Sequence, residues 1–345
     1  MQDYYDTNRQ NNWNHNHVNT REELQTYDPD LAQFIAETFR HTKKTDWRYK
    51  PVAKQPRTTA PPKSLKCDSF YKKYVYARGL PILASENVSD EALLEANYLV
   101  RHMFAYRHDI LKAMIDSGMR LVVIGRNERV TDIPEYKKYG VPPSGGQFGV
   151  PPSGGLSGSG IPNENDRPKA GLQTLRGLDY TVDRGVVSVG EENLLNRRGD
   201  PHAGECMLIA RMAHAIYVIV GHRPVDPDFD KRQKQQYELR VKRIDKEFND
   251  KLEQLYANAL RKGLWKNAPA ARGHEEYWVE GVKSWFDCNG ESACPDGIRN
   301  SVNTREALEA YDPDLARFVA EVFRHTDRAD AWRYRKLSAR RDGGQ

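Results

Sequence analysis

The chain has 345 residues, of which 38% are hydrophobic and 29% are charged, and its formal net charge is +5. This length fits one large domain or two smaller ones, the low apolar share indicates some solvated linker, and the positive charge is interleaved with acids, which argues against a nucleic-acid partner. No apolar run reaches about 18 residues and the polar N-terminus does not resemble a signal peptide, so we expect neither a membrane span nor a cleaved leader.

An internal repeat opens and closes the chain. Residues 18–42 read VNTREELQTYDPDLAQFIAETFRHT, and residues 302–326 read VNTREALEAYDPDLARFVAEVFRHT. Such similarity indicates duplication. We interpret residues 1–50 as the C-terminal tail of a preceding module, and residues 67–335 as a second module of which residues 302–335 are the matching tail. The alternative is a terminal subdomain that was duplicated for packing.

Three segments have the composition of irregular structure. Residues 51–66 combine four prolines with basic residues and are predicted to be an extended linker. Residues 140–171 contain the repeat GVPPSGGQF and GVPPSGGLS, which cannot build a core, and we predict a disordered surface insertion. Residues 336–345 form a short polar tail.

The remaining pattern predicts an α+β domain, mostly helical with a small sheet. Caps, apolar periodicity and β-branched runs define its elements. In chain order we expect a helix starting at Ser89 or Asp90, a helix over 109–116, strands over 119–125 and 185–190, a buried helix over 204–220, a long charged helix or helix pair over 228–262, a helix over 275–287, and a last helix with Asp312 as its cap and Pro313 in its first turn.

The helix over 204–220 contains two conspicuous polar residues, Arg211 and His214, among apolar neighbours. They are three positions apart and so share a face. A buried arginine needs a counter-charge. Glu276 and Glu280, four apart on the next predicted helix, are the candidates, and we expect Arg211 to pair with one of them.

These two helices resemble those of the gluzincin zinc metallopeptidases. The run around residues 210–214 has the shape of a His-Glu-x-x-His helix, and the two glutamates at 276 and 280 form a Glu-x-x-x-Glu pattern. The sequence of residues 276–281 and the short strand over 186–189 are similar to those of the anthrax lethal-factor-like branch. They are also similar to those of secreted predicted metallopeptidases of bacteria and fungi. The resemblance covers residues 67–335 and implies a zincin-like fold.

The resemblance also implies a zinc site. Its ligands would be position 210, His214 and Glu276, with Glu280 supporting the site and position 211 activating water. Ala210 and Arg211 stand where a ligand histidine and the catalytic glutamate belong. Zinc is therefore expected in the family but lost or weak here, and His274 or His202 are alternative ligands.

Two functions follow as alternatives. The first is a degenerate, non-catalytic metallopeptidase-like protein that binds a peptide or protein in the former cleft and along its edge strand. The second is an active metallopeptidase, with a rearranged metal site or with catalysis in an upstream module. The resemblance implies an extracellular location.

The cysteines give one further expectation. Cys288 and Cys294 enclose a short loop that the first copy of the repeat lacks, which suggests a disulfide, although two independent thiols remain the alternative. Cys206 lies in an apolar helix and is predicted to be a core residue.

Overall fold

The computed structural model describes residues 24–26, 28–38, 57–137, 175–182, 184–221, 245, 247–293, 295–297, 299–328 and 331–336. The chain divides into two compact units, Met1–Pro56 and Arg57–Gln345. The predicted insertion over 140–171, nearly all of the predicted tail over 336–345 and the first part of the predicted charged helix lie outside the described residues. In the first unit, the principal described element is helix α3 (Pro29–Thr38).

The second unit contains a four-stranded sheet with the strand order β1-β2-β3-β4. Strands β1 (Lys73–Ala77) and β2 (Leu80–Ala84) form an antiparallel hairpin, whereas β3 (Arg120–Ile124) runs parallel to both β2 and β4 (Val186–Gly190). All residues of β2 and β4 are buried, as expected for strands that are covered on both faces. The strands predicted over 119–125 and 185–190 are confirmed as β3 and β4.

The β1–β2 hairpin was not predicted. Its turn residues Arg78 and Gly79 both have positive φ, which is the backbone of the tight turns that join antiparallel strands. The sequence Leu-Pro-Ile-Leu-Ala of β2 is buried throughout and contains a proline. It therefore lacks the alternation by which a half-buried strand is detected.

Helices make up most of the second unit, so the predicted α+β class, mostly helical with a small sheet, is confirmed. Within the described residues they are α4 (Asp90–Met103), α5 (His108–Asp116), α6 (Pro134–Lys137), α7 (Glu191–Leu194), α8 (Met207–Ile219), α10 (Phe248–Arg261), α11 (His274–Trp285), α12 (Arg305–Tyr311) and α13 (Pro313–Phe323), with short 3-10 turns at Lys63–Leu65, Val130–Asp132 and Pro269–Arg272. No helix among the described residues is long and apolar enough to cross a membrane.

Local chemistry explains where these helices start. The Ser89 side chain accepts a hydrogen bond from the backbone of α4, and Asp312 does the same for α13, as their predicted capping roles require. Helix α8 starts at Met207 and not at Gly204, because Gly204 has a φ of +100° and the Asn193 side chain accepts the Met207 N–H at 2.8 Å. The cap of α8 thus comes from a different helix, α7, which local sequence cannot reveal.

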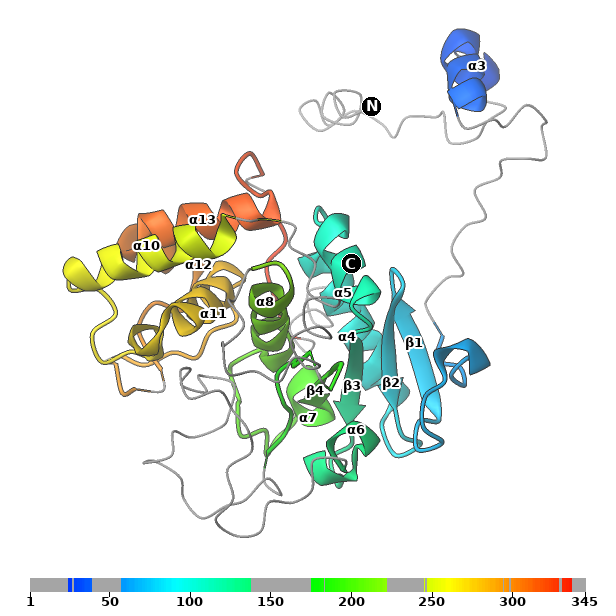
Figure 1. Cartoon of the computed structure of the whole chain (residues 1–345), viewed down its shortest axis with the longest axis horizontal. Helices are drawn as coiled ribbons and strands as arrows, with labels where there is room; N and C mark the ends of the chain where they lie inside the picture. Colours follow the sequence, from blue (N-terminus) through cyan, green and yellow to red (C-terminus); the bar gives the residue numbers. More distant parts are fainter. Residues whose placement is uncertain are drawn as a thin grey trace, which may run out of the picture. The chain divides into compact units, whose positions relative to one another are not determined.

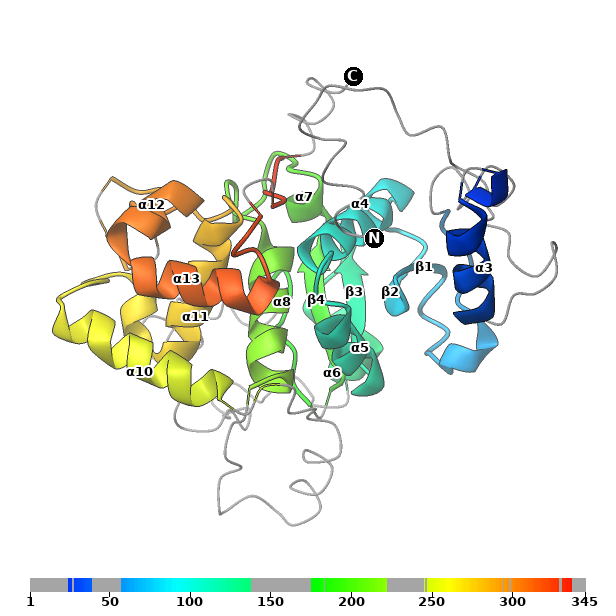
Figure 2. The same ribbon diagram turned by 90° about the horizontal axis from the view of Figure 1, so that it is seen from above.

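The helices lie in layers beside the sheet. One hydrophobic core joins one face of the sheet to α4, α5 and α8, and it continues into α10, α11 and α13. Helix α8 lies between β4 and the group of α10, α11 and α13, as two perpendicular views show (Figure 1, Figure 2). A smaller core on the opposite face includes Val122, Ile124 and Tyr136. Helix α8 is therefore buried nearly all round, in agreement with its apolar sequence.

Candidate functional site

Helices α8 and α11 pack directly on each other. The indole N–H of Trp278 on α11 donates a hydrogen bond of 2.8 Å to the backbone oxygen of Ala213 on α8. The predicted site residues of the two helices therefore lie in one buried region, which we call the α8–α11 site. It comprises Ala210, Arg211 and His214 on α8, Glu275 and Glu276 on α11, and Asp179 from the segment before β4.

Arg211 is paired within this site, but with a different residue from those predicted. Its guanidinium lies 2.8 Å from the carboxylate of Asp179 and donates a second hydrogen bond of 3.0 Å to the backbone oxygen of Gly177. Both members of the ion pair are buried, with Arg211 only 2% exposed. The expectation that Arg211 pairs with Glu276 or Glu280 is wrong, because the segment over 175–182 brings a closer carboxylate to it.

That segment also covers the outer edge of β4. The N–H of Gly190 donates to the backbone oxygen of Arg176 at 2.8 Å, and the N–H of Ser188 donates to that of Leu178 at 3.0 Å. Gly177 lies between the two accepting residues with a φ of +144°, and a Cβ there would come within 2.2 Å of the Ser188 oxygen. Glycine is therefore required at this position, and the outer edge of β4, one of the two edges of the sheet, is already hydrogen-bonded to the chain itself.

His214 contacts the glutamate that precedes the predicted metal ligand. Its Nε2 atom lies 2.6 Å from an oxygen of Glu275. Burial lowers the pKa of His214, but the charges of Glu275 and Asp179 and the hydrogen bond to Glu275 outweigh it, so the pKa is raised. The buried Nδ1 atom has no hydrogen-bond partner among the described residues.

Glu276 is buried without a partner. It is 2% exposed, and neither carboxyl oxygen has a hydrogen-bond partner in the part of the chain that the structure describes. Burial raises its pKa to about 9, with further contributions from the charges of Glu275, Glu280 and Asp179. The Glu276 side chain is therefore a neutral carboxylic acid at pH 7.

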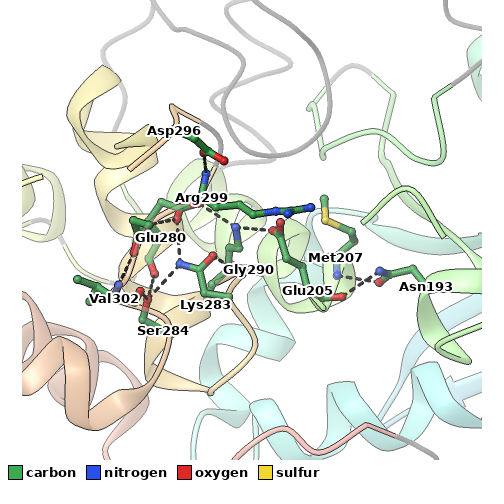
Figure 3. Close-up of polar contacts among 12 residues, drawn as sticks. Asn193, Glu205, Met207, Glu280, Lys283, Ser284, Gly290, Asp296, Arg299 and Val302 are labelled. Carbon is green, nitrogen blue, oxygen red and sulfur yellow. Dashed lines mark hydrogen bonds and ion pairs between the residues drawn. The ribbon is translucent and has the colours of Figure 1, made fainter. Parts of the chain in front are cut away.

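Glu280, one turn further along α11, belongs to a different cluster, the lysine network. The buried ammonium of Lys283 lies 2.8 Å from Glu280 and 2.7 Å from Glu205, and Figure 3 shows it between the two carboxylates. Asn289 donates to the other oxygen of Glu280 at 2.9 Å, and Asn300 donates to it at 3.3 Å. The carboxylate predicted to support a metal site is thus held by a lysine and two amides.

The two histidines proposed as alternative ligands make other contacts. His274 accepts or donates a 2.8 Å hydrogen bond with the Tyr217 hydroxyl through its Nε2 atom, which also lies 3.8 Å from Glu253. His202 lies in the turn before α8, and burial, with the charge of Arg211 next, lowers its pKa. Among the described residues, no three His, Cys, Asp or Glu side chains are grouped so as to hold a metal ion.

The donor set of the α8–α11 site therefore does not fit a catalytic zinc ion. Such an ion takes three protein ligands that are free of protons and keeps one position open. Ala210 has no donor atom, and the Nε2 atom of His214 lies 2.6 Å from Glu275. The guanidinium of Arg211 adds a positive charge to the same region.

Three residues of this region were missed from the sequence. Asp179 lies 32 positions before Arg211 in an irregular segment and carries no local signal. Glu275 precedes Glu276, and the metallopeptidase pattern assigns a role to Glu276 but none to Glu275. Lys283 could have been found, because a lysine three positions after a glutamate on one helix is a recognisable ion-pair spacing.

The cysteine expectations fall into two groups. Cys206 is 1% exposed in the main core, as predicted. Cys288 is 1% exposed, burial raises the pKa of its thiol well above the usual value, and its backbone oxygen accepts the N–H of Cys206 at 3.1 Å. Cys294 lies outside the described residues, so the predicted pairing with Cys288 stays a prediction.

Comparison with known proteins gives one distant likeness. No protein-family model matches the chain, and no curated protein matches its sequence. The structure is similar to that of the PRO-PRO endopeptidase (PPEP-2) from Paenibacillus alvei, with a TM-score of 0.39 and 14% sequence identity. The match covers 70% of this chain and 96% of that chain. A likeness of this size does not by itself define a shared fold.

Proposed function

We propose that this protein is a degenerate zinc metallopeptidase-like protein of the zincin type, which is non-catalytic and acts by binding a peptide or protein. The observation that carries the proposal is the buried ion pair between Arg211 and Asp179. It lies on the helix whose sequence resembles a His-Glu-x-x-His motif, at the position where the water-activating glutamate would stand. The proposal also places the protein outside the cell, on the strength of that resemblance.

The chemistry of the site supports a loss of hydrolysis. A guanidinium donates hydrogen bonds and has no acceptor atom, so Arg211 cannot act as the base that takes a proton from water. Loss of a general base alone costs about 10²- to 10⁴-fold in rate. The buried positive charge also disfavours a dication in the same low-dielectric region.

The contacts along β4 restrict where a partner could bind. Because residues 176–178 are hydrogen-bonded to the outer edge of β4, an incoming extended peptide could add to that edge only after displacing them. The partner of this proposal is therefore expected at side-chain surfaces of the second unit and not as an added strand on β4.

Metal analysis of the purified full chain tests the proposal. We expect less than about 0.1 equivalent of zinc after dialysis against buffer with micromolar zinc, and no casein digestion, because fewer than three ligands bind zinc weakly. One tight equivalent of zinc, together with digestion that a chelator abolishes, would show an active enzyme with a rearranged site.

A restored variant provides the matched control. Ala210→His with Arg211→Glu rebuilds the motif, and Asp179→Asn removes the acid that would then lack its arginine. We expect this triple variant to bind about one equivalent of zinc. Ala210→Gln with Arg211→Lys, which keeps the positive charge, should bind none. A triple variant that folds but takes up no zinc would contradict the relationship to zincins.

A further inference from the structure

The repeated sequence at the two ends of the chain forms the same local structure in both copies. In the second copy, Asp312 caps α13 by accepting the Leu315 N–H at 3.1 Å. In the first copy, Asp28 accepts the Leu31 N–H at 2.9 Å at the start of α3. Both helices also begin with proline, and their apolar residues match at the first eight positions, whereas Thr38 of α3 stands where α13 has Val322 (both helices are labelled in Figure 1).

The second copy shows what the apolar face of this helix contacts. Leu315 is fully buried on Gly281 of α11, where a Cβ would come within 2.7 Å of it. The ring of Phe318 lies edge-on to Trp278 of α11 at 5.8 Å and tilted against Phe248 of α10 at 5.3 Å. The face of α13 is therefore matched to a surface of Gly281, Trp278 and Phe248, which we call the α11 face.

The first copy presents the equivalent side chains to solvent. Leu31, which matches Leu315, is 40% exposed, and Phe34, which matches Phe318, is 65% exposed. Leu315 and Phe318 are 0% and 5% exposed. Two large apolar side chains that are exposed on one helix, and buried at the matching positions of the other, indicate a binding surface.

The differences between the two copies point to the same conclusion. The 25-residue copies differ at six positions. Three of these correspond to the exposed residues Glu309, Ala310 and Arg317, and a fourth exchanges Val319 for an isoleucine. The other two place a glutamate where Ala307 stands and a threonine where the buried Val322 stands. The residues that make contact with the α11 face, Leu315 and Phe318, are unchanged in the first copy.

We propose that α3 is a docking helix whose partner is a second polypeptide that carries an open α11-type face, that is, a module built like residues 57–301 whose own terminal helix is missing or displaced. The α11 face of this chain is already covered by α13. Two wild-type copies therefore gain no buried surface by exchanging helices, and they do not associate through α3. This inference is independent of the proposed loss of catalysis.

A binding experiment with full chains tests the docking role of α3. The probe is the full chain with Leu315→Asp and Phe318→Asp, which opens its α11 face, and with Phe34→Asp, which prevents its own α3 from filling that face. We expect the immobilised probe to capture the wild-type chain, and Phe34→Asp in the captured chain to weaken binding at least 10-fold. Tyr76→Asp, at a 59% exposed site on β1, is the matched control and should bind like the wild type.

The folded state of the probe decides how the result is read. Slow amide hydrogen exchange in α8 and α11 establishes that the probe is folded. If it is not, Phe34→Asp with Phe318→Ala replaces it, because the alanine removes contacts without burying a charge. A folded probe that captures no wild-type chain, or that captures Phe34→Asp equally well, overturns the proposal. Association of two wild-type chains that Phe34→Asp abolishes would make a second copy the partner and would overturn it as well.

Discussion

Two buried polar regions lie side by side on α8 and α11, and they differ in how completely their atoms are paired. In the lysine network, the ammonium of Lys283 contacts two carboxylates, and two amides complete the bonding of Glu280. In the α8–α11 site, Glu276 has two buried oxygens without a partner among the described residues. Buried polar atoms in native proteins are nearly always bonded, so a substitution in the lysine network breaks existing bonds, whereas a substitution of Glu276 breaks no hydrogen bond among the described residues.

Removing the lysine of the fully paired region should have the largest effect. Lys283→Met leaves the carboxylates of Glu205 and Glu280 buried without their cation. Breaking a buried pair from one side costs about 3–5 kcal/mol, and here two acids are affected. We expect at least this loss in the free energy of unfolding, measured by urea denaturation at pH 7.

The control for this prediction is an ion pair of the same kind on the surface. Lys112 lies 2.7 Å from Asp116 with a side chain that is 73% exposed. Lys112→Met should cost less than about 0.5 kcal/mol. Equal losses in the free energy of unfolding for Lys283→Met and Lys112→Met would show that burial does not increase the contribution of the lysine network to stability.

The substitution Arg211→Met should cause the second-largest loss in the free energy of unfolding. It leaves a single buried acid, Asp179, without its cation, and the expected loss is about 3 kcal/mol. Asp179→Asn in the same chain should recover much of the loss, because a neutral amide costs less to bury than an unpaired carboxylate. A double-mutant cycle measured by urea denaturation gives the coupling free energy between Arg211 and Asp179. Additive effects of the two substitutions would show that the ion pair does not stabilise the protein.

The sequence predicted the parts of this comparison that depend on local pattern. Strong periodicity and caps identified α4, α8, α11 and α13, and these position both regions. The pairing of Arg211 with Asp179 and of Lys283 with Glu205 could not be predicted, because both acids lie in irregular segments that only the tertiary fold brings to the helices. The start of α8 was misplaced for the same reason, since its cap comes from Asn193.

Glu276→Gln and Glu280→Gln should have effects of opposite sign at pH 9. The pKa of Glu276 is raised from 4.5 to about 9 in the folded state. Its contribution to stability is therefore complete below about pH 4.5 and is lost as the pH rises towards 9. Glu276→Gln removes this loss and should stabilise the protein by a few kcal/mol at pH 9, since a pKa shift of one unit corresponds to about 1.4 kcal/mol.

Glu280→Gln is the matched control, because it removes a carboxylate that Lys283 needs. We expect it to lower the melting temperature at every pH. Melting temperatures of the three chains between pH 5 and pH 9 distinguish the two glutamates. A wild-type melting temperature that does not fall above pH 5 while that of Glu276→Gln also stays constant would show that Glu276 has an ordinary pKa.

The smallest expected effect concerns His214 and Glu275. The raised pKa of His214 adds stability that is complete below its unfolded value of about 6.5 and is lost as the pH rises through the folded value. Glu275→Gln removes the nearest carboxylate, so the pKa of His214 should fall and the protein should lose about 1 kcal/mol at pH 5.5 but less at pH 9. NMR titration of the His214 ring protons measures the pKa directly, with Glu253→Gln beside His274 as the control. If Glu275→Gln leaves the titration of His214 unchanged, Glu275 does not raise the pKa of the imidazole, and Arg211 with Asp179 is the ion pair that stabilises the α8–α11 site.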